Sequence, residues 1–446
     1  MKNLSTTMFL ITLFFALSLN IIYAQLPFDP FSAYSGNPVL PADPGTWDEL
    51  ATWWPNVVFV NDTFYMLYNG TTNLSSDPVS IGLATSSDGF TYSKSDSNPI
   101  LSGDGSGFDA YNAGDGVLVF NNSTWYLYYT GKSSPPNQLG NVISRAISNS
   151  GPHGPWIRSD DSLLTVGSLG EWDSNFIGPE TIIENGSELI MYYFAGASWL
   201  HNPQIGMATS TDGGLTWEKY NDPSTTTPPY IESDPVLRGD KPYDILSIPG
   251  CTVIKHEMIW EMFYGGRSSN SIVSICYAIS WDGIIWEKDT INSPIFTPFQ
   301  DPIASDAIVK PSVVTVDSLY FMYYDYNVTS DGIGLATANI LSVENLLGSL
   351  PSAYSLYQNY PNPFNPSTSI VFGLPEASEV KLTLFNSLGE EVADLFDGYK
   401  TAGYHQVEFN ATELTSGVYF YQLIAFDPST GSGQGFCETK KMVLIK

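Results

Sequence analysis

Apolar and polar positions alternate along most of the chain, and turn residues interrupt them at short intervals. A representative stretch has a β-branched run (55–60), then an aromatic run (64–70), then the run I-G-L-A-T-S (81–86). Gly, Asn, Asp and Pro separate these runs, as is typical of turns between short strands. No helical period competes with this pattern before residue 340. The sequence therefore predicts an all-β fold.

The strand pattern recurs five times, at a spacing of about sixty residues. Each copy opens with a motif like N-P-V-L and contains one aromatic strand, at 64–70, 125–131, 189–196, 260–266 and 320–326. Four-stranded units repeated around an axis form a β-propeller. A linear array of small β-domains is the alternative, but so small a sheet would be only marginally stable alone. We therefore expect residues 27–340 to form a five-bladed β-propeller.

The fifth copy is incomplete at its carboxyl end. It stops at Ala336-Thr337-Ala338 and lacks the glycine turn and aromatic residue that close other copies, for example at 281–286. The segment 30–36, before the first N-P-V-L motif, stands where an outer strand would end in the other copies. This arrangement predicts that the N-terminal segment completes blade five and closes the ring.

The third copy closes with the stretch S-T-D-G-G-L-T-W (210–217). Asp212 can accept hydrogen bonds from turn amides, Gly213 and Gly214 can adopt positive φ, and Trp217 can pack into the blade. The stretch resembles the Asp box of sialidase-type propellers, in which this turn lies on the face away from the pocket. We therefore interpret it as a structural turn, in preference to an active-site loop.

The two ends of the chain differ from the repeats. Lys2, the apolar run 7–22 and the Tyr23-Ala24-Gln25 site are typical of a secretory signal peptide over residues 1–24. A membrane anchor is the alternative, but Ser18 and Asn20 interrupt the apolar run. Residues 341–356 are expected to form a linker.

The tail, residues 357–446, has the pattern of a small antiparallel Ig-like β-sandwich. Its opening run Y-Q-N-Y-P-N-P-F-N-P-S-T (357–368), the strand S-G-V-Y-F-Y-Q-L (416–423) and the terminus K-K-M-V-L-I-K resemble the type A C-terminal sorting domain of the type nine secretion system. A generic Ig-like module is the alternative. The resemblance implies a Bacteroidota-like source and recognition by the type nine machinery. It also implies export across the outer membrane, with release or attachment at the cell surface.

Charge and cysteine content exclude several classes of function. The chain has 17 basic and 46 acidic residues, a net charge of −29, so nucleic acid and anionic membranes are unfavourable partners. Cys251 and Cys276 are expected on the first and third strands of blade four, about 9–10 Å apart, which is too far for a disulfide.

No sequence motif indicates a cofactor. Neither H-E-x-x-H nor paired C-x-x-C is present, so a zinc site is not expected. A calcium ion at the propeller axis is compatible with the many carboxylates, but no motif supports it. We expect a monomer without a cofactor.

The repeat G-x-W-D…P-x-V-x…Y-M-Y-Y-x-G…I-G-x-A-T-S-x-D-G-x-x-W resembles the five-bladed glycoside hydrolases of families 43, 32 and 130. The resemblance implies a pocket on the central axis, lined by the starts of the innermost strands and by the loops after the second strands. It also implies carboxylates on blades one, two and three. Glycoside cleavage requires two carboxylates flanking the scissile bond.

Candidate catalytic carboxylates follow from this resemblance. Asp115 stands at the strand start of blade two and Glu180 at that of blade three. On blade one the family 43 pattern has Asp immediately before Pro, whereas this chain has Trp54, so Asp48 or Glu49 would have to substitute. Asp48 recurs as Asp109, Asp173, Asp244 and Asp306, and a residue repeated in every blade more often has a structural role.

Candidate binding residues are Trp53, Trp54, Trp199, Arg267 and Lys310. The three tryptophans could stack on sugar rings, although packing between blades would explain them equally well. Arg267 could bind hydroxyls or a carboxylate, or form a surface ion pair. The leading hypothesis is a glycoside hydrolase that acts on polysaccharide. The alternatives are a non-catalytic glycan-binding propeller and a purely structural surface protein.

Overall fold

The computed structural model describes residues 26–72, 78–133, 141–159, 161–198, 203–256, 259–326, 332–341, 351, 354–359, 362–426 and 435–446. Nearly all regular structure in these ranges is β-strand, apart from two 3₁₀ turns, Gly107–Asp109 and Pro298–Gln300. None of the described segments is a helix of the length and apolarity needed to cross a membrane. The expected signal peptide lies outside the described residues.

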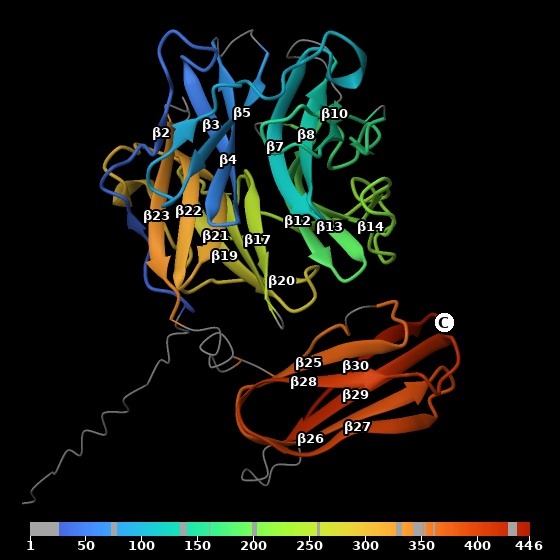
Figure 1. Cartoon of the computed structure of the whole chain (residues 1–446). Coiled ribbons are helices and arrows are strands. Elements are labelled where there is room, and N and C mark those ends of the chain that lie inside the picture. Colours follow the sequence, from blue (N-terminus) through green and yellow to red (C-terminus); the bar gives the residue numbers. More distant parts are fainter. Residues whose placement is uncertain are drawn as a thin grey trace, which may run out of the picture.

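Five antiparallel sheets surround a common axis in the upper part of Figure 1. The first four follow the chain, each with its innermost strand first. Blade one has β3 (Ala51–Val60), β4 (Thr63–Thr71), β5 (Ser80–Ser86) and β6 (Ser93–Lys94); blade two has β7 (Asn112–Asn121), β8 (Thr124–Lys132), β9 (Val142–Ser148) and β10 (Ile157–Arg158), with β11 (Leu164–Thr165) also on β9; blade three has β12 (Phe176–Asn185), β13 (Glu188–Gly196), β14 (Gln204–Ser210) and β15 (Glu218–Lys219), with β16 (Pro235–Leu237) also on β14; blade four has β17 (Cys251–Lys255), β18 (Trp260–Arg267), β19 (Val273–Ser280) and β20 (Trp286–Lys288). The all-β propeller predicted from the repeats is confirmed.

Blade five joins the two ends of the propeller. It contains β21 (Ile308–Val316), β22 (Leu319–Tyr326) and β23 (Gly332–Asn339), and its outer strand is β1 (Ser32–Ala33). Ser32 pairs with Thr337, and β2 (Leu40–Pro41) also pairs with β23. The prediction that the N-terminal segment completes this blade is confirmed.

The repeated aspartates attach the outer strand of each blade to its interior. Each buried carboxylate forms an ion pair with a basic residue of the same blade's outermost strand: Asp48 with Lys94 (2.6 Å), Asp109 with Arg158, Asp173 with Lys219 (2.5 Å) and Asp244 with Lys288 (2.6 Å). The structural role expected for these residues thus takes the form of a repeated ion pair.

In blade five the corresponding carboxylate is Asp301. It accepts hydrogen bonds from Tyr324 Oη (2.5 Å) and Asn37 Nδ2 (2.9 Å), as Asp109 accepts one from Tyr129 in blade two. The sequence comparison assigned this position to Asp306, and that assignment is wrong. Asp306 is exposed, and Asp301 was missed because a 3₁₀ turn shifts it relative to the other copies.

The 210–217 stretch forms a turn held by one carboxylate. Asp212 Oδ1 accepts hydrogen bonds from Leu215 N and Thr216 N, both at 3.0 Å, and from Ser210 Oγ at 2.8 Å. Trp217 Nε1 donates to Gly214 O at 3.3 Å. These bonds all stay within the turn, which fits the structural interpretation of the stretch.

The cysteines are unbridged, as predicted from their strand positions. Cys251 and Cys276 both pair with Tyr264, from opposite sides of that strand. Both thiols are buried and free, and Cys437 is free and exposed.

The tail forms a separate sandwich of two sheets (Figure 1). One sheet has β24 (Ser355–Leu356), β25 (Ser367–Leu374) and β28 (Gly403–Asn410); the other has β27 (Glu391–Lys400), β26 (Ser378–Asn386), β29 (Gly417–Phe426) and β30 (Phe436–Leu444). Alternate residues of both sheets, such as Phe372 and Leu423, fill one core between them. β24 lies inside the range 341–356 that was expected to be a linker.

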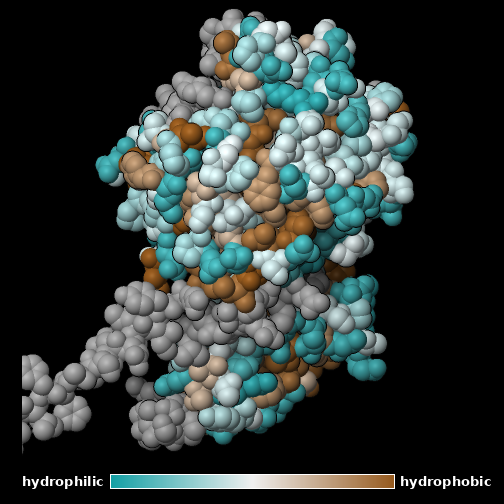
Figure 2. Space-filling model, turned by 60° about the vertical axis from the view of Figure 1, so that its left-hand side comes forward, coloured by the Kyte–Doolittle hydropathy of each residue, from teal (hydrophilic) through white to brown (hydrophobic). Residues whose placement is uncertain are grey.

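The sandwich contacts blade four of the propeller through a small apolar cluster. Trp281 lies 4.6 Å from the ring of Tyr404 and 5.8 Å from that of Tyr357, measured between centroids. Val371 and Ile259 complete the buried part of the cluster. Elsewhere, on the face shown in Figure 2, apolar side chains form small areas separated by polar ones.

Candidate functional site

Irregularities in the innermost strands place four side chains at one end of the axis. β3, β7, β12 and β21 each shift register near their first residues. The residues at these bulges are Trp54, Asp115, Glu180 and Lys310. Bulges redirect side chains and occur often at barrel rims and active sites.

Three of these residues have strained backbone conformations. The φ angles are 62° at Trp54, 53° at Asp115 and 52° at Lys310. Non-glycine residues rarely adopt positive φ, and such strain costs on the order of 1–3 kcal/mol. Retention of the strain in three blades at one end of the axis marks this end as the candidate site.

Glu180 and Lys310 form a buried ion pair between blades three and five. The Lys310 ammonium lies 2.5 Å from Glu180 Oε2, and both side chains are almost completely buried. Cys251 N also donates to Oε2, at 3.0 Å. Glu180 Oε1 is buried and accepts no hydrogen bond in the described structure, so one oxygen of this carboxylate remains available.

Gly250 of blade four allows this ion pair to form. Its φ is 95°, and a Cβ there would lie 2.8 Å from Lys310 Cδ and 3.2 Å from Glu180 Oε2. Every other blade carries a side chain at the corresponding position. The absence of one in blade four leaves the path along which Lys310 reaches Glu180.

Burial raises the pKa of Glu180 to about 7. The Lys310 ammonium and the Cys251 amide act in the opposite direction, and the Asp115 carboxylate adds to the increase. A carboxyl group with a pKa near 7 can hold a proton at neutral pH, which is the property required of a general acid.

Asp115 is held by one residue of the neighbouring blade. Asn69 Nδ2 donates to Asp115 Oδ1, and Asp115 N donates to Asn69 Oδ1, both at 2.8 Å. This pair of bonds fixes both the backbone and the carboxylate of Asp115. Unlike Glu180, Asp115 is partly exposed, so it can meet a ligand from solvent.

Asp325 is a third carboxylate at this site. It accepts a hydrogen bond from Trp54 N at 2.6 Å. Burial raises its pKa well above the ordinary value, and the Asp115 and Glu180 carboxylates add to the increase, whereas Lys310 opposes it. Three carboxylates from three blades therefore interact around one ammonium.

The Trp54 indole lies among these groups. Its ring is 5.2 Å from the ring of Phe194 in blade three, and the Lys310 ammonium lies 5.1 Å from its centroid. Trp54 thus crosses the axis from blade one to blades three and five. Its Nε1 is buried without a hydrogen-bond partner in the described structure.

Other predicted residues lie outside this cluster. Asp48 is engaged with Lys94, and the exposed Glu49 accepts a hydrogen bond from Gly45 N, so neither replaces a blade-one carboxylate. Trp53 is half-buried in β3, and Arg267 ends β18 with a buried, unpartnered Nε. Trp199 lies outside the described residues.

Asn69 and Asp325 were not among the predicted site residues. They occupy one repeat position on the second strand, where the other blades have Thr130, Phe194 and Gly265. The variation at this otherwise aromatic, repetitive strand was the available signal. Within the described ranges, no group of three or more His, Cys, Asp or Glu residues is arranged to hold a metal ion.

Comparison with protein families identifies the tail. Residues 358–430 match the family described as the secretion system C-terminal sorting domain. The tail is a type nine sorting domain. It directs the protein through that system to the cell surface or the extracellular space, as the sequence predicted.

Solved structures resemble the propeller in fold. The protein BT0996, in a complex with RGII, has 18% identity and a TM-score of 0.55, covering 71% of this protein and 93% of its own length. A putative glycoside hydrolase from Parabacteroides distasonis has 14% identity and a TM-score of 0.53, covering 70% and 97%. A glycosyl hydrolase from Bacteroides ovatus has 15% identity and a TM-score of 0.53, covering 70% and 94%. The comparison with curated proteins gave no match.

Proposed function

We propose that the propeller is an exported glycosidase, with Glu180 as the general acid and Asp115 as the second carboxylate. The observation that carries the proposal is the meeting of Asp115, Glu180 and Asp325 at one end of the axis, with a pKa of about 7 at Glu180. The export signal in the tail and the glycoside hydrolases among its fold neighbours fit this function.

Each group has a distinct task in the proposed reaction. Protonated Glu180 would donate its proton to the glycosidic oxygen as the bond to the leaving sugar breaks. Asp115, oriented by Asn69, would activate water or attack the anomeric carbon directly. Lys310 would stabilise the Glu180 carboxylate that forms when the proton leaves, and Trp54 would pack against a sugar ring.

One observation favours a glycan-binding propeller without catalysis. Trp54 occupies the blade-one position at which the related pattern has an aspartate, and its indole lies against Lys310. In this second candidate, the strained ring of side chains would recognise a sugar without cleaving it.

Release of reducing sugar from arabinans, xylans, mannans and fructans tests the proposal. The exported protein would be compared with its Asp115→Asn and Glu180→Gln variants, and Asp306→Asn, a change at an exposed carboxylate, is the control. We expect release by the protein and its control and a loss of about a hundredfold or more in each site variant. Retention of a polysaccharide without any release would support the binding function, and release that survives both variants would refute the assignment.

A further inference from the structure

Blade three differs from the other blades at one position on its second strand. Four blades have an aromatic residue there: Phe64, Trp125, Trp260 and Tyr320. Each packs on an aromatic ring of the preceding blade, with centroids 5.2 Å from Phe321, 5.0 Å from Tyr65, 6.4 Å from Tyr192 and 5.4 Å from Phe263, respectively. Blade three has Leu189, so the junction with blade two lacks this aromatic contact.

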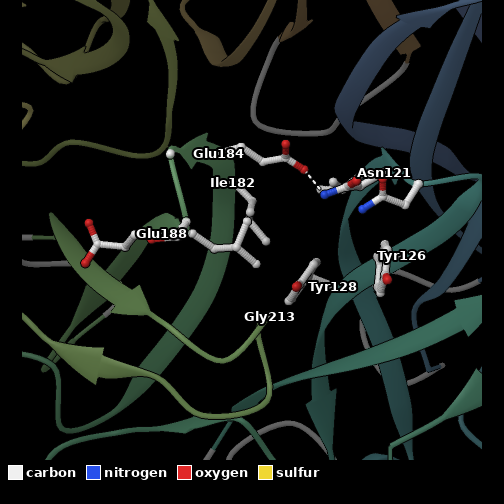
Figure 3. Close-up of a pocket in the computed structure, with 12 residues that line it drawn as sticks. Asn121, Tyr126, Tyr128, Ile182, Glu184, Glu188 and Gly213 are labelled. Atoms are coloured by element: carbon white, nitrogen blue, oxygen red, sulfur yellow. Dashed lines mark hydrogen bonds between the residues drawn. The ribbon is translucent and has the colours of Figure 1, made fainter.

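A hollow lies at this junction. Its volume is about 220 Å³, and Leu189 is part of its wall. Blade two contributes Tyr126, Tyr128 and Asn121, and blade three contributes Ile182 and Glu184 (Figure 3). The smaller side chain thus leaves a space where the other junctions are filled by stacked rings.

Buried contacts hold the hollow in shape. Arg145 is only 5% exposed, and its guanidinium carbon lies 5.4 Å from the Tyr126 centroid and 5.9 Å from that of Tyr128. Arg145 Nη1 donates to Gly213 O at 2.9 Å, which links the tyrosines to the turn of blade three. The hollow therefore exists before any ligand arrives.

The wall chemistry is that of a neutral sugar site. Tyrosine rings present apolar faces with a polar edge, and Glu184, already hydrogen-bonded to Asn121, can accept further hydrogen bonds from hydroxyl groups. Glu188 is a second carboxylate in the wall, which disfavours anions. The volume is below the roughly 300–1,000 Å³ of sites for drug-sized ligands, which suits a single sugar ring.

We propose that this hollow, lined by Tyr126, Tyr128, Asn121 and Glu184, is a second saccharide-binding site for one neutral sugar unit of a glycan. It lies at the far end of β7 from Asp115, six residues along the strand and therefore about 20 Å away. The site does not depend on the proposed function at the axis. It would hold a glycan to the propeller whether or not the axial carboxylates cleave it.

Filling the hollow tests the proposal without disturbing the axis. Leu189→Trp restores the aromatic residue of the other blades and should preserve folding, which thermal melting would verify. The probes are methyl glycosides of glucose, galactose, mannose, xylose and arabinose, observed by saturation-transfer NMR with the exported protein. We expect transfer to at least one probe, about tenfold weaker binding in Leu189→Trp, and unchanged binding in the Asp115→Asn variant.

A second variant, Tyr126→Ala, covers the case in which Leu189→Trp does not fold. It removes a partly exposed ring and should weaken binding of the same probe by a similar factor. Absence of transfer to every probe would overturn the proposal, as would transfer that survives these changes. Transfer that disappears in Asp115→Asn instead would assign the sugar to the axis and also overturn it.

Discussion

At the scale of single residues, the axial site depends on a missing side chain. Gly250 leaves the space through which Lys310 reaches Glu180, and no property of Lys310 or Glu180 alone would pair residues from blades three and five. The strained backbone at Asp115 and Lys310 has a similar meaning, because it turns these side chains toward the axis at a cost in stability.

Gly250→Ala should destabilise the propeller more than a control at the same φ. Both φ strain and the 2.8 Å approach to Lys310 oppose the new methyl group. Gly105→Ala is the control, because Gly105 has a φ of 83° and nothing within 4 Å of its Cβ position. We expect about 1 kcal/mol of lost stability for Gly105→Ala and about 2–4 kcal/mol for Gly250→Ala, measured by urea unfolding. Equal losses would show that the path past Gly250 is not constrained.

Ionisation of Glu180 should make the propeller less stable as the pH rises. Its pKa is raised to about 7 in the folded state and is near 4.5 in the unfolded chain, so the folded state binds the extra proton between these values. The stability from this group is fully present below pH 4.5 and is lost as the pH rises through 7. The free energy of unfolding, measured from pH 4 to 8, should fall by about 3 kcal/mol more in the protein than in Glu180→Gln. Parallel pH profiles would contradict the raised pKa.

At the scale of elements, one ion pair repeated in four blades fixes the outer strands. These strands are short, only two or three residues long, so their own backbone hydrogen bonds hold them weakly. The buried aspartate gives each strand a strong partner inside its blade. This explains why Asp48 and its counterparts recur without any part in the axial site.

Lys219→Met should therefore cost more than an equivalent change on the surface. It leaves the Asp173 carboxylate completely buried without its cation, which typically costs about 3–5 kcal/mol. Lys241→Met is the matched control, since Lys241 pairs with an exposed Asp240, and it should cost less than about 1 kcal/mol. Urea unfolding of the two variants decides the matter, and similar losses would remove the structural role of the repeated pair.

Sequence patterns predicted elements much better than they predicted the site. The repeat fixes strands because every blade buries the same faces, so five copies report one structure. Asp115 and Glu180 could be found because they interrupt the repeat. Asp325 and Asn69 could not be assigned, because their meeting with Trp54 and Asp115 depends on how adjacent blades stack, which one blade's pattern does not contain. Asp48 misled for the opposite reason, since its position before a strand resembles that of a site residue.

At the scale of the whole molecule, one turn of blade four carries the sorting domain. The turns 86–89, 210–213 and 280–283 share the pattern S-x-D-G, and their second residues are exposed Ser87, exposed Thr211 and buried Trp281. The tail covers Trp281 with Tyr357 and Tyr404. Burial raises the pKa of Asp282 in this turn, whereas turn hydrogen bonds lower that of Asp88.

Trp281→Ser should release the tail from the propeller. Serine is the residue of blade one at this position, so the turn itself should stay intact. We expect a larger radius of gyration in small-angle scattering and faster proteolysis between residues 341 and 356, with unchanged melting of the propeller. Ile285→Ser, at a residue that is 54% exposed on the same turn, is the control. An unchanged radius would mean that Trp281 does not hold the two parts together.

The pairing of Ser32 with Thr337 also sets a clock for the molecule. The first strand of the propeller has no partner until the last blade has been synthesised, which takes about 15–70 s at typical elongation rates. Contacts so distant in sequence slow folding further. During this interval the chain is an open ribbon and not a closed ring, and an open ribbon can still be threaded through a narrow channel. Joining its two ends in blade five thus postpones folding of the complete propeller until almost the entire chain is available.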